Sequence, residues 1–295
     1  MNTGRRRADF SAVTALAPVV ALLPVWLVAI AIYWIPFRIY GDVSYPLFAL
    51  CCMLFGVVLF SRPVQRLVFV RLLDARVPAA SEKEQLNAAW KVVAQANHLP
   101  TSRFVLAVVE SDDVNAFACG GHLLVVSSFA IEHLTHDELC GVLAHELSHH
   151  MGGHTVALTI SQWMSLPIML LAQAGLALRT FNNTATAMLA ERYPSVRLFG
   201  KIIGVVLISL SRVLLTGLIV SHVLSNAVGK SAEYHADERA FKMGFGRELL
   251  HALRRVESRE ITHPQSTPIG LTTMSHPPAR TRIARLEAMS TMGGR

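Results

Sequence analysis

Charged residues are scarce in this sequence. Asp, Glu, Lys and Arg make up 16% of its 295 residues, whereas an ordinary soluble domain contains about 25%. Hydrophobic residues make up 52%, and the mean hydropathy is +0.42. This balance argues against a chain that is soluble along its whole length and predicts membrane-spanning segments.

Cysteine motifs are also missing. The four cysteines include no C-x-x-C pair, which leaves a zinc ribbon or a thioredoxin-type redox site unsupported. Cys51 and Cys52 lie in an apolar run, and we expect all four cysteines to be reduced packing residues. For Cys119, an oxidisable thiol near a cleft is the alternative.

Acidic residues are outnumbered by basic ones. The chain has 20 Asp and Glu against 27 Lys and Arg, which gives a formal net charge of +7. The basic residues stand beside apolar runs and not on a stripe with interleaved aromatic residues. We therefore expect these basic residues to contact the head groups of the lipid bilayer and not a nucleic acid.

Long apolar runs occur in two pairs. They cover approximately residues 11–37, 45–60, 155–178 and 202–224. The first run is too long for the apolar region of a signal peptide and lacks a clean cleavage site, so we expect a retained transmembrane helix. Basic residues flank the first pair at Arg5–Arg7 and Arg62–Arg76, which places both of its ends on the cytoplasmic side.

The second pair leaves two questions open. The connection between its runs contains Arg179, Arg192, Arg197 and Lys201. The segment 155–225 crosses the membrane either twice or not at all, and this basic excess argues against two crossings by the positive-inside trend. We favour two crossings because 155–178 is long and uncharged. Arg212, inside the last run, is either a functional residue or one that faces a wet cavity or pairs with a neighbouring segment.

From about Ser81 the sequence resembles that of an ordinary folded domain. Ser81 and Glu84 fit a capping box for a helix that runs to about residue 97. Thr135 and Glu138 fit a second capping box, for a helix that runs to about Met151. Further helices are expected at 231–244, 247–257 and 279–289.

A small sheet is expected between these helices. Residues 103–110 are typical of a strand, and residues 115–126 are typical of a hairpin. The pair Gly120–Gly121 would form its two-residue turn.

The helix that follows the hairpin contains an H-E-x-x-H motif, with His145, Glu146 and His149. Residues four apart share a helix face, so both imidazoles can bind one ion. Imidazole suits Zn²⁺, which lowers the pKa of bound water to about 7, and Glu146 could act on that water as general base. The motif arises by chance in roughly one chain in a hundred, so a third ligand must be found.

His150 and His154 follow the motif but are not expected to be ligands. His150 is rotated about 100° from His149 around the helix. His154 lies beyond two glycines, where the helix can break. We expect both at the surface or behind the ligands.

The third ligand should be a carboxylate or a histidine on another helix. Glu233 and Asp237 are four residues apart and share a face, and His235 lies off that face. Glu233 would reach the metal, and Asp237 would orient a ligating histidine or an arginine. The alternative is a solvated acidic helix start.

Together, H-E-L-S-H and the later E-x-x-x-D resemble the HtpX-like membrane zinc metalloproteases, relatives of the CAAX prenyl proteases. Asn115–Gly120 is similar to the family's N-A-F-x-x-G segment, and Ser275–Ile283 to its H-P-x-x-x-x-R pattern. The resemblance covers most of the chain from about Ser81 onward and the membrane hairpins. Cys119 departs from it, because the family often has threonine there.

The resemblance implies a mainly α membrane protein. It would have about four transmembrane helices and an α+β zincin-like (gluzincin) catalytic domain with a small β-sheet. Asn115, Ala116 and Phe117 would form an edge strand that holds the substrate by its backbone. His276 would stabilise the tetrahedral intermediate, and Arg282 would pair with Asp237.

We therefore expect a membrane hairpin at 1–76, a first catalytic part at 77–154, a second membrane hairpin at 155–225 and a second catalytic part at 226–295. The chain would be a multi-pass cell-membrane endopeptidase with one Zn²⁺ and its site on the cytoplasmic side. Its substrates would be polypeptides, and the resemblance implies quality control of membrane proteins. The alternatives are a regulatory protease with one membrane partner and a non-catalytic zinc-stabilised scaffold. Glu146 argues against the scaffold, because a structural metal site needs no base.

Overall fold

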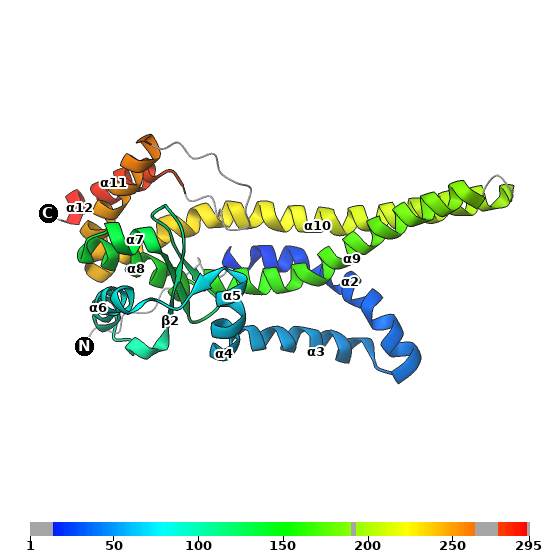
Figure 1. Cartoon of the computed structure of the whole chain (residues 1–295), viewed down its shortest axis with the longest axis horizontal. Helices are drawn as coiled ribbons and strands as arrows, with labels where there is room; N and C mark the ends of the chain where they lie inside the picture. The colour runs from blue at the N-terminus through cyan, green and yellow to red at the C-terminus, as the bar shows by residue number, and fades with distance from the viewer. Residues whose placement is uncertain (1–13, 190–192, 263–276, 294–295) are drawn as a thin grey trace. The chain divides into compact units, whose positions relative to one another are not determined.

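A computed structural model of the chain describes residues 14–189, 193–262 and 277–293. The elements are mainly helices, and the described residues contain one four-stranded sheet (Figure 1). They form two compact units. The helical unit comprises Ala17–Gly56 and Ile160–Ser225, and the mixed unit comprises mainly Val57–Thr159 and Asn226–Arg295. The expected mainly α fold with a small sheet is confirmed.

The helical unit is built from α2 (Ala17–Gly41), α3 (Tyr45–Val57) and parts of α9 (His154–Leu189) and α10 (Pro194–Ala240). Its buried core includes Leu22, Trp26, Met164, Ile168 and Leu214. Because apolar side chains predominate in the membrane-length stretches of these helices, they also expose many large hydrophobic residues. Such exposure is costly in water and favourable in lipid.

Three helical stretches of the described chain are long and apolar enough to cross a membrane: Ala17–Gly41, His154–Leu189 and a span within Ser195–Ser258. A fourth candidate combines Tyr45–Phe60 with Arg62–Leu72, which are bent by 68° at a short break. The expectation of about four membrane helices is confirmed. Arg212 lies at the exposed surface of α10, where the described residues give it no ion pair.

A chain of short helical pieces leads from α3 into the mixed unit. These pieces are η1 (Val58–Phe60), α4 (Arg62–Val64), the π-helix η2 (Gln65–Phe69) and α5 (Val70–Leu72). Gln65 is fully buried at the start of η2. Its side-chain amide donates to the carbonyl oxygen of Leu59 at 3.2 Å.

The sheet of the mixed unit has the strand order β1-β2-β4-β3. The strands are β1 (Ala75–Arg76), β2 (Val105–Val109), β3 (Ala116–Cys119) and β4 (Leu123–Ser127). β2 and β4 pair in parallel, and the two outer pairs are antiparallel. β3 therefore lies at an edge of the sheet, beside α8 (His136–Met151).

The β3–β4 hairpin is present, but its turn differs from the expected two residues. Cys119 pairs with Leu123, so three residues, Gly120 to His122, connect the strands. The added residue has non-local partners. The N–H of His122 donates to the side-chain oxygen of Gln65 at 3.0 Å, and its carbonyl accepts from the N–H of Val105 at 2.6 Å. Gly120 has φ +59, and a side chain there would collide with Gln65.

One expected capping box is confirmed and the other is wrong. At the start of α8, the N–H of Glu138 donates to the Thr135 hydroxyl at 3.3 Å, and the N–H of Thr135 donates to the Glu138 carboxylate at 2.8 Å. Helix α6 (Ala80–Ala96) begins one residue before Ser81. Glu82, not Glu84, caps it by accepting from the N–H of Ala79 at 2.6 Å, because Arg76 also holds that carboxylate in place.

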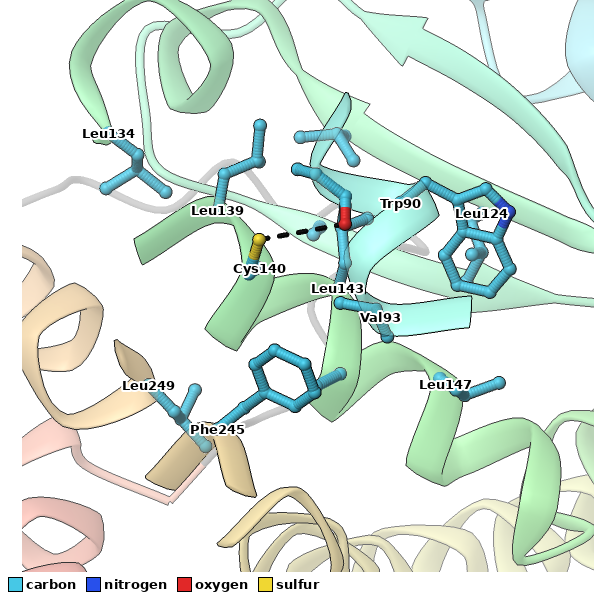
Figure 2. Packing of buried hydrophobic residues seen from close by; sticks show 14 of the residues in the cluster. Trp90, Val93, Leu124, Leu134, Leu139, Cys140, Leu143, Leu147, Phe245 and Leu249 are labelled. Atoms are coloured by element: carbon cyan, nitrogen blue, oxygen red, sulfur yellow. Dashed lines mark hydrogen bonds between the residues drawn. The ribbon is translucent and has the colours of Figure 1, made fainter. Parts of the chain in front are cut away.

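The core of the mixed unit lies between α6, α8 and one face of the sheet. Figure 2 shows Trp90 and Leu124 on one side of α8, and Phe245 and Leu249 on the other. Cys140 is buried there, and its thiol donates to the carbonyl of Ala89 at 3.6 Å. All four cysteines are free, as expected.

The remaining helices close over α8. The expected helix at 231–244 is the end of the continuous α10, followed by the π-helix η4 (Phe241–Phe245), in which Gly244 has φ +91. Helices α11 (Gly246–Thr262) and α12 (Ala279–Gly293) follow. α11 crosses α8 at Gly141, where a Cβ atom would lie 2.3 Å from the backbone nitrogen of Leu249. Only glycine allows this close approach.

Candidate active site

Three side chains that are candidate metal ligands meet in the mixed unit. His145 and His149 come from α8, and Glu233 comes from the end of α10. The Nε2 atoms of the two histidines lie 3.3 Å apart. The Glu233 carboxylate oxygens lie 3.3 Å from Nε2 of His145 and 3.2 Å from Nε2 of His149. His145 and Glu233 are buried, with 3% and 5% of their surfaces exposed.

The spacing of these donor atoms fits a small divalent cation. Four ligands at zinc-like bond lengths of about 2.0–2.1 Å form a tetrahedron with edges of roughly 3.3–3.4 Å. Each of the three separations is close to one edge of that tetrahedron, and the two carboxylate distances end on different oxygens of Glu233, Oε2 towards His145 and Oε1 towards His149. Two imidazoles and one carboxylate are also a donor set found in catalytic zinc sites. In the described part of the chain this is the one cluster of His, Cys, Asp and Glu side chains that could hold a metal ion.

Asp237 holds His145 from behind. Its Oδ1 atom lies 2.9 Å from Nδ1 of His145, and only 1% of the residue is exposed. We assign the Nδ1 proton to this hydrogen bond, because the contact of Arg282 Nη2 with the same nitrogen is longer, at 3.3 Å. That assignment leaves the Nε2 lone pair of His145 directed at the other two donor atoms.

Arg282 from α12 completes this arrangement. Its Nε donates to Oδ2 of Asp237 at 2.9 Å, and its Nη2 donates to Oδ1 at 2.7 Å. Burial by itself raises the pKa of Asp237, but the hydrogen bonds from His145 and Arg282 outweigh it and lower the pKa to about 2. Asp237 is therefore a carboxylate at neutral pH, and the pairing expected for Arg282 and Asp237 is present.

Glu146 lies beside His145 on α8 and is also buried, with 4% of its surface exposed. Burial by itself lowers the pKa of Arg282, but nearby carboxylates raise it above its usual value. Asp237 and Glu233 contribute most to this rise, and the negative charge of Glu146 adds to it. The carboxylate thus belongs to the same buried charge network as the three donor groups.

His150 and His154 do not join the cluster. Nε2 of His150 donates to the carbonyl of Leu123 at 3.2 Å, and Nδ1 accepts from the Thr155 hydroxyl at 3.2 Å. Burial lowers the pKa of His150 to about 4, so this histidine is neutral and ties α8 to β4. The ring of His154 lies edge-on, 6.2 Å from that of His149.

Other expected site residues are placed as follows. His235 is half-exposed and faces Glu238, with 3.9 Å between Nδ1 and the carboxylate. His276 lies outside the described residues. Asn115 precedes β3 and is tied to β4 by its N–H, which donates to the Ser127 hydroxyl at 3.0 Å. Ala116 and Phe117 are in β3, whose outer edge pairs with no strand of the described chain.

Comparison with known proteins assigns the chain to a family. The family model described as "Peptidase family M48" matches residues 80–290, a range that contains every donor group of the cluster.

The chain belongs to peptidase family M48.

Relatives in this family include proteases named HtpX. The HtpX of Shewanella baltica strain OS185 is 30% identical over 198 residues, which cover 62% of this chain and 67% of the relative. The HtpX of Shewanella oneidensis strain MR-1 is 28% identical over a region of the same length. The expected resemblance to HtpX-like membrane metalloproteases is therefore confirmed.

One solved structure has a similar fold. The crystal structure of S. mikatae Ste24p matches with a TM-score of 0.52 and 18% sequence identity. The match covers 90% of this chain but 62% of the Ste24p chain, so this chain spans less than two thirds of that structure. At this identity the likeness supports the fold alone.

Membership in M48 makes the chain a metalloprotease and implies a divalent metal and polypeptide substrates, and the candidate membrane spans with the HtpX relatives indicate a membrane protein. Sequence reasoning missed one residue beside this M48 site. Arg239, two residues after Asp237, donates from Nη1 to the carbonyl of Ser148 at 2.9 Å. A side chain at Gly152 would collide with the same guanidinium. No local sequence signal indicates this contact, because Arg239 and Ser148 are 91 residues apart in the sequence.

Proposed function

We propose that this M48 chain is a zinc-dependent endopeptidase that cleaves membrane proteins at a site on the cytoplasmic side. One observation carries the proposal: the Nε2 atoms of His145 and His149 and the carboxylate of Glu233 lie 3.2–3.3 Å from one another, close to the buried carboxylate of Glu146. Two imidazole nitrogens with one carboxylate favour Zn²⁺ among the common divalent ions. When bound, the metal would polarise the scissile carbonyl and lower the pKa of water.

The residues of the chain would divide the remaining work. Glu146 would accept the proton of the attacking water and pass it to the leaving amine. Asp237 would keep His145 in the tautomer that directs Nε2 at the metal, and Arg282 would keep Asp237 in place. The outer edge of β3, from Asn115 to Phe117, would pair with the substrate backbone as an added strand.

Two further roles extend the proposal beyond the described geometry. His276 would donate a hydrogen bond to the oxyanion, as the H-P-x-x-x-x-R pattern implies. The cellular task would be removal of damaged membrane proteins. Cleavage of one dedicated membrane partner is the alternative task for the same chemistry, and the two differ in how many unrelated substrates are cut.

The test compares Glu146→Gln with Glu132→Gln, an identical change at an exposed position of α7 (Ser128–His133). Each purified full-length protein is loaded with zinc, and bound metal and cleavage of a model membrane substrate are measured. We expect Glu146→Gln to retain its zinc while its cleavage rate falls by about a hundredfold or more, the usual scale for loss of a general base. Glu132→Gln should match the wild type.

Two outcomes contradict the proposal. Wild-type cleavage by the Glu146→Gln protein would remove Glu146 from the mechanism. A wild-type protein that binds zinc tightly but cleaves none of several membrane substrates would support the zinc-stabilised scaffold instead.

A further inference from the structure

A basic cavity lies in the mixed unit, apart from the candidate metal ligands. Its volume is about 560 Å³, and it is bounded by η2 and α5, β1, α6 and β2. None of His145, Glu146, His149 or Glu233 lines it. The peptidase chemistry proposed above therefore leaves this cavity without a role.

The cavity has an excess of positive charge. Four basic side chains line it, Arg66, Arg76, Lys83 and Lys91, and no Asp or Glu does. The charge of Arg76 is neutralised by two carboxylates that do not line the cavity. Its guanidinium donates to Glu82 at 2.6 and 2.7 Å and to Glu110 at 2.6 Å. The other three cations form no ion pair within the described part of the chain, so they are available to an anion.

These cations lie on two different walls of the cavity. Lys83, Asn87 and Lys91 are spaced by four residues and so share one face of α6. Arg66 stands on η2, which belongs to the other wall. Polar side chains of Thr101 and Ser102 add further possible donors to the rim. A phosphate-sized anion in the cavity would meet positive charge from both of these elements.

The floor of the cavity is apolar. It includes Leu86, Trp90 and Phe104, all buried, together with Val70. An anion with an attached hydrocarbon part fits such a surface better than a fully hydrated ion does, because the apolar part covers surface that water otherwise contacts.

The Arg66 wall also continues from a candidate membrane span. Arg66 lies in the piece Arg62–Leu72, which follows Tyr45–Phe60 after the 68° bend. This piece exposes Leu67, Val68 and Leu72 by 61%, 51% and 75%. Exposed apolar side chains interleaved with arginines are typical of a helix that lies in the plane of the membrane surface. Arg66 would then stand at the level of the lipid head groups.

We propose that this cavity binds the phosphate-bearing head group of an anionic phospholipid, with Arg66, Lys83 and Lys91 as its cationic contacts. A water-soluble phosphate ester shares the anionic chemistry. The apolar floor and the membrane-proximal wall favour the lipid. The proposal stands independently of the peptidase activity.

The test titrates the purified full-length protein in neutral detergent with phosphatidylglycerol, phosphatidylcholine or glycerol 3-phosphate, and counts bound molecules by native mass spectrometry. Wild type is compared with the double variant Lys83→Gln/Lys91→Gln. The control is Lys242→Gln/Arg247→Gln, which removes the same charge from exposed positions outside the cavity. All four side chains are exposed, so the variants should fold.

We expect wild type and control to bind phosphatidylglycerol in preference to phosphatidylcholine. The cavity variant should lose about tenfold or more in affinity for phosphatidylglycerol, since each membrane-surface cation contributes roughly a fivefold factor. Asn87→Glu, which places a carboxylate between the two lysines, should weaken binding at least as much. An equal loss in cavity variant and control would overturn the site, as would equal binding of the two lipids. Glycerol 3-phosphate that binds as tightly as phosphatidylglycerol would overturn the lipid assignment.

Discussion

Arg282 holds Asp237 with two parallel hydrogen bonds, from Nε to Oδ2 at 2.9 Å and from Nη2 to Oδ1 at 2.7 Å. Both residues are buried, and the same carboxylate contacts Nδ1 of His145. The contact between the pair joins two segments far apart in the sequence, the end of α10 and the start of α12. The orientation of His145 therefore depends on the last helix of the chain.

This relationship predicts how three variants compare. Asp237→Ala and Arg282→Ala should each lower zinc affinity or cleavage by about 10–100-fold, the usual effect of losing support behind a ligand. The double variant should be little worse than either single one, because both changes remove the same interaction. Zinc dissociation against a chelator and residual cleavage measure the effect. Additive losses would show that the two residues act separately.

Glu233→Ala should have a different effect from those variants. It leaves two imidazoles, so zinc should be lost on mild chelation and cleavage abolished. The control is Glu238→Ala, five residues along the same helix, where the carboxylate is partly exposed and pairs with Lys242 at 2.7 Å. Metal content after dialysis distinguishes the two. Full zinc occupancy in Glu233→Ala would make the ligand assignment wrong, and His235 or His276 would be the next candidate.

The topology of the second pair of apolar runs follows from the cluster. His145 and His149 precede α9, and Glu233 lies near the end of α10, yet all three meet at one point. The chain between them must return to the side from which it started. With two crossings, Asn183→Cys should react with a membrane-impermeant maleimide only from the non-cytoplasmic side. Labelling only from the cytoplasmic side would exclude the spanning hairpin.

Gln65 should stabilise the β3–β4 hairpin. Replacement by Leu keeps the volume but leaves the N–H of His122 without its partner at 3.0 Å. Loss of a buried hydrogen-bond partner costs about 1–3 kcal/mol. We therefore expect Gln65→Leu to lower the thermal midpoint in detergent, and Gln95→Leu, at an exposed position of α6, to leave it nearly unchanged. Equal midpoints for the two variants would contradict the role of Gln65.

The features that the sequence predicted well are those with local causes. The Thr135–Glu138 capping box and the helix it opens depend on residues within one turn, so both could be inferred directly. His145, His149 and Glu233 could be selected because helix periodicity puts each on a definite face. Their grouping into one site was proposed from helix spacing, with a solvated acidic helix start as the alternative, and the resemblance to known metalloproteases then supported it.

The features that sequence reasoning missed have non-local causes. Glu82 replaces Glu84 as the cap of α6 because Arg76, outside the helix, fixes its carboxylate. The hairpin turn has three residues because Gln65 binds His122 from a distant helix. The parallel pairing of β2 with β4 likewise depends on long-range packing. A pattern of residue types contains no information on which distant side chain will occupy a given space.

The positions of the donor groups along the chain determine when the metal site can form during synthesis. The two histidines of the cluster are synthesised before α9, but Glu233 emerges only after the second long apolar run, and Arg282 after that. A growing chain therefore has an incomplete set of donor groups until both apolar runs have left the ribosome. The metal site would be completed only after α9 and the apolar part of α10 have been made, so the nascent protein could not cleave neighbouring chains before that point.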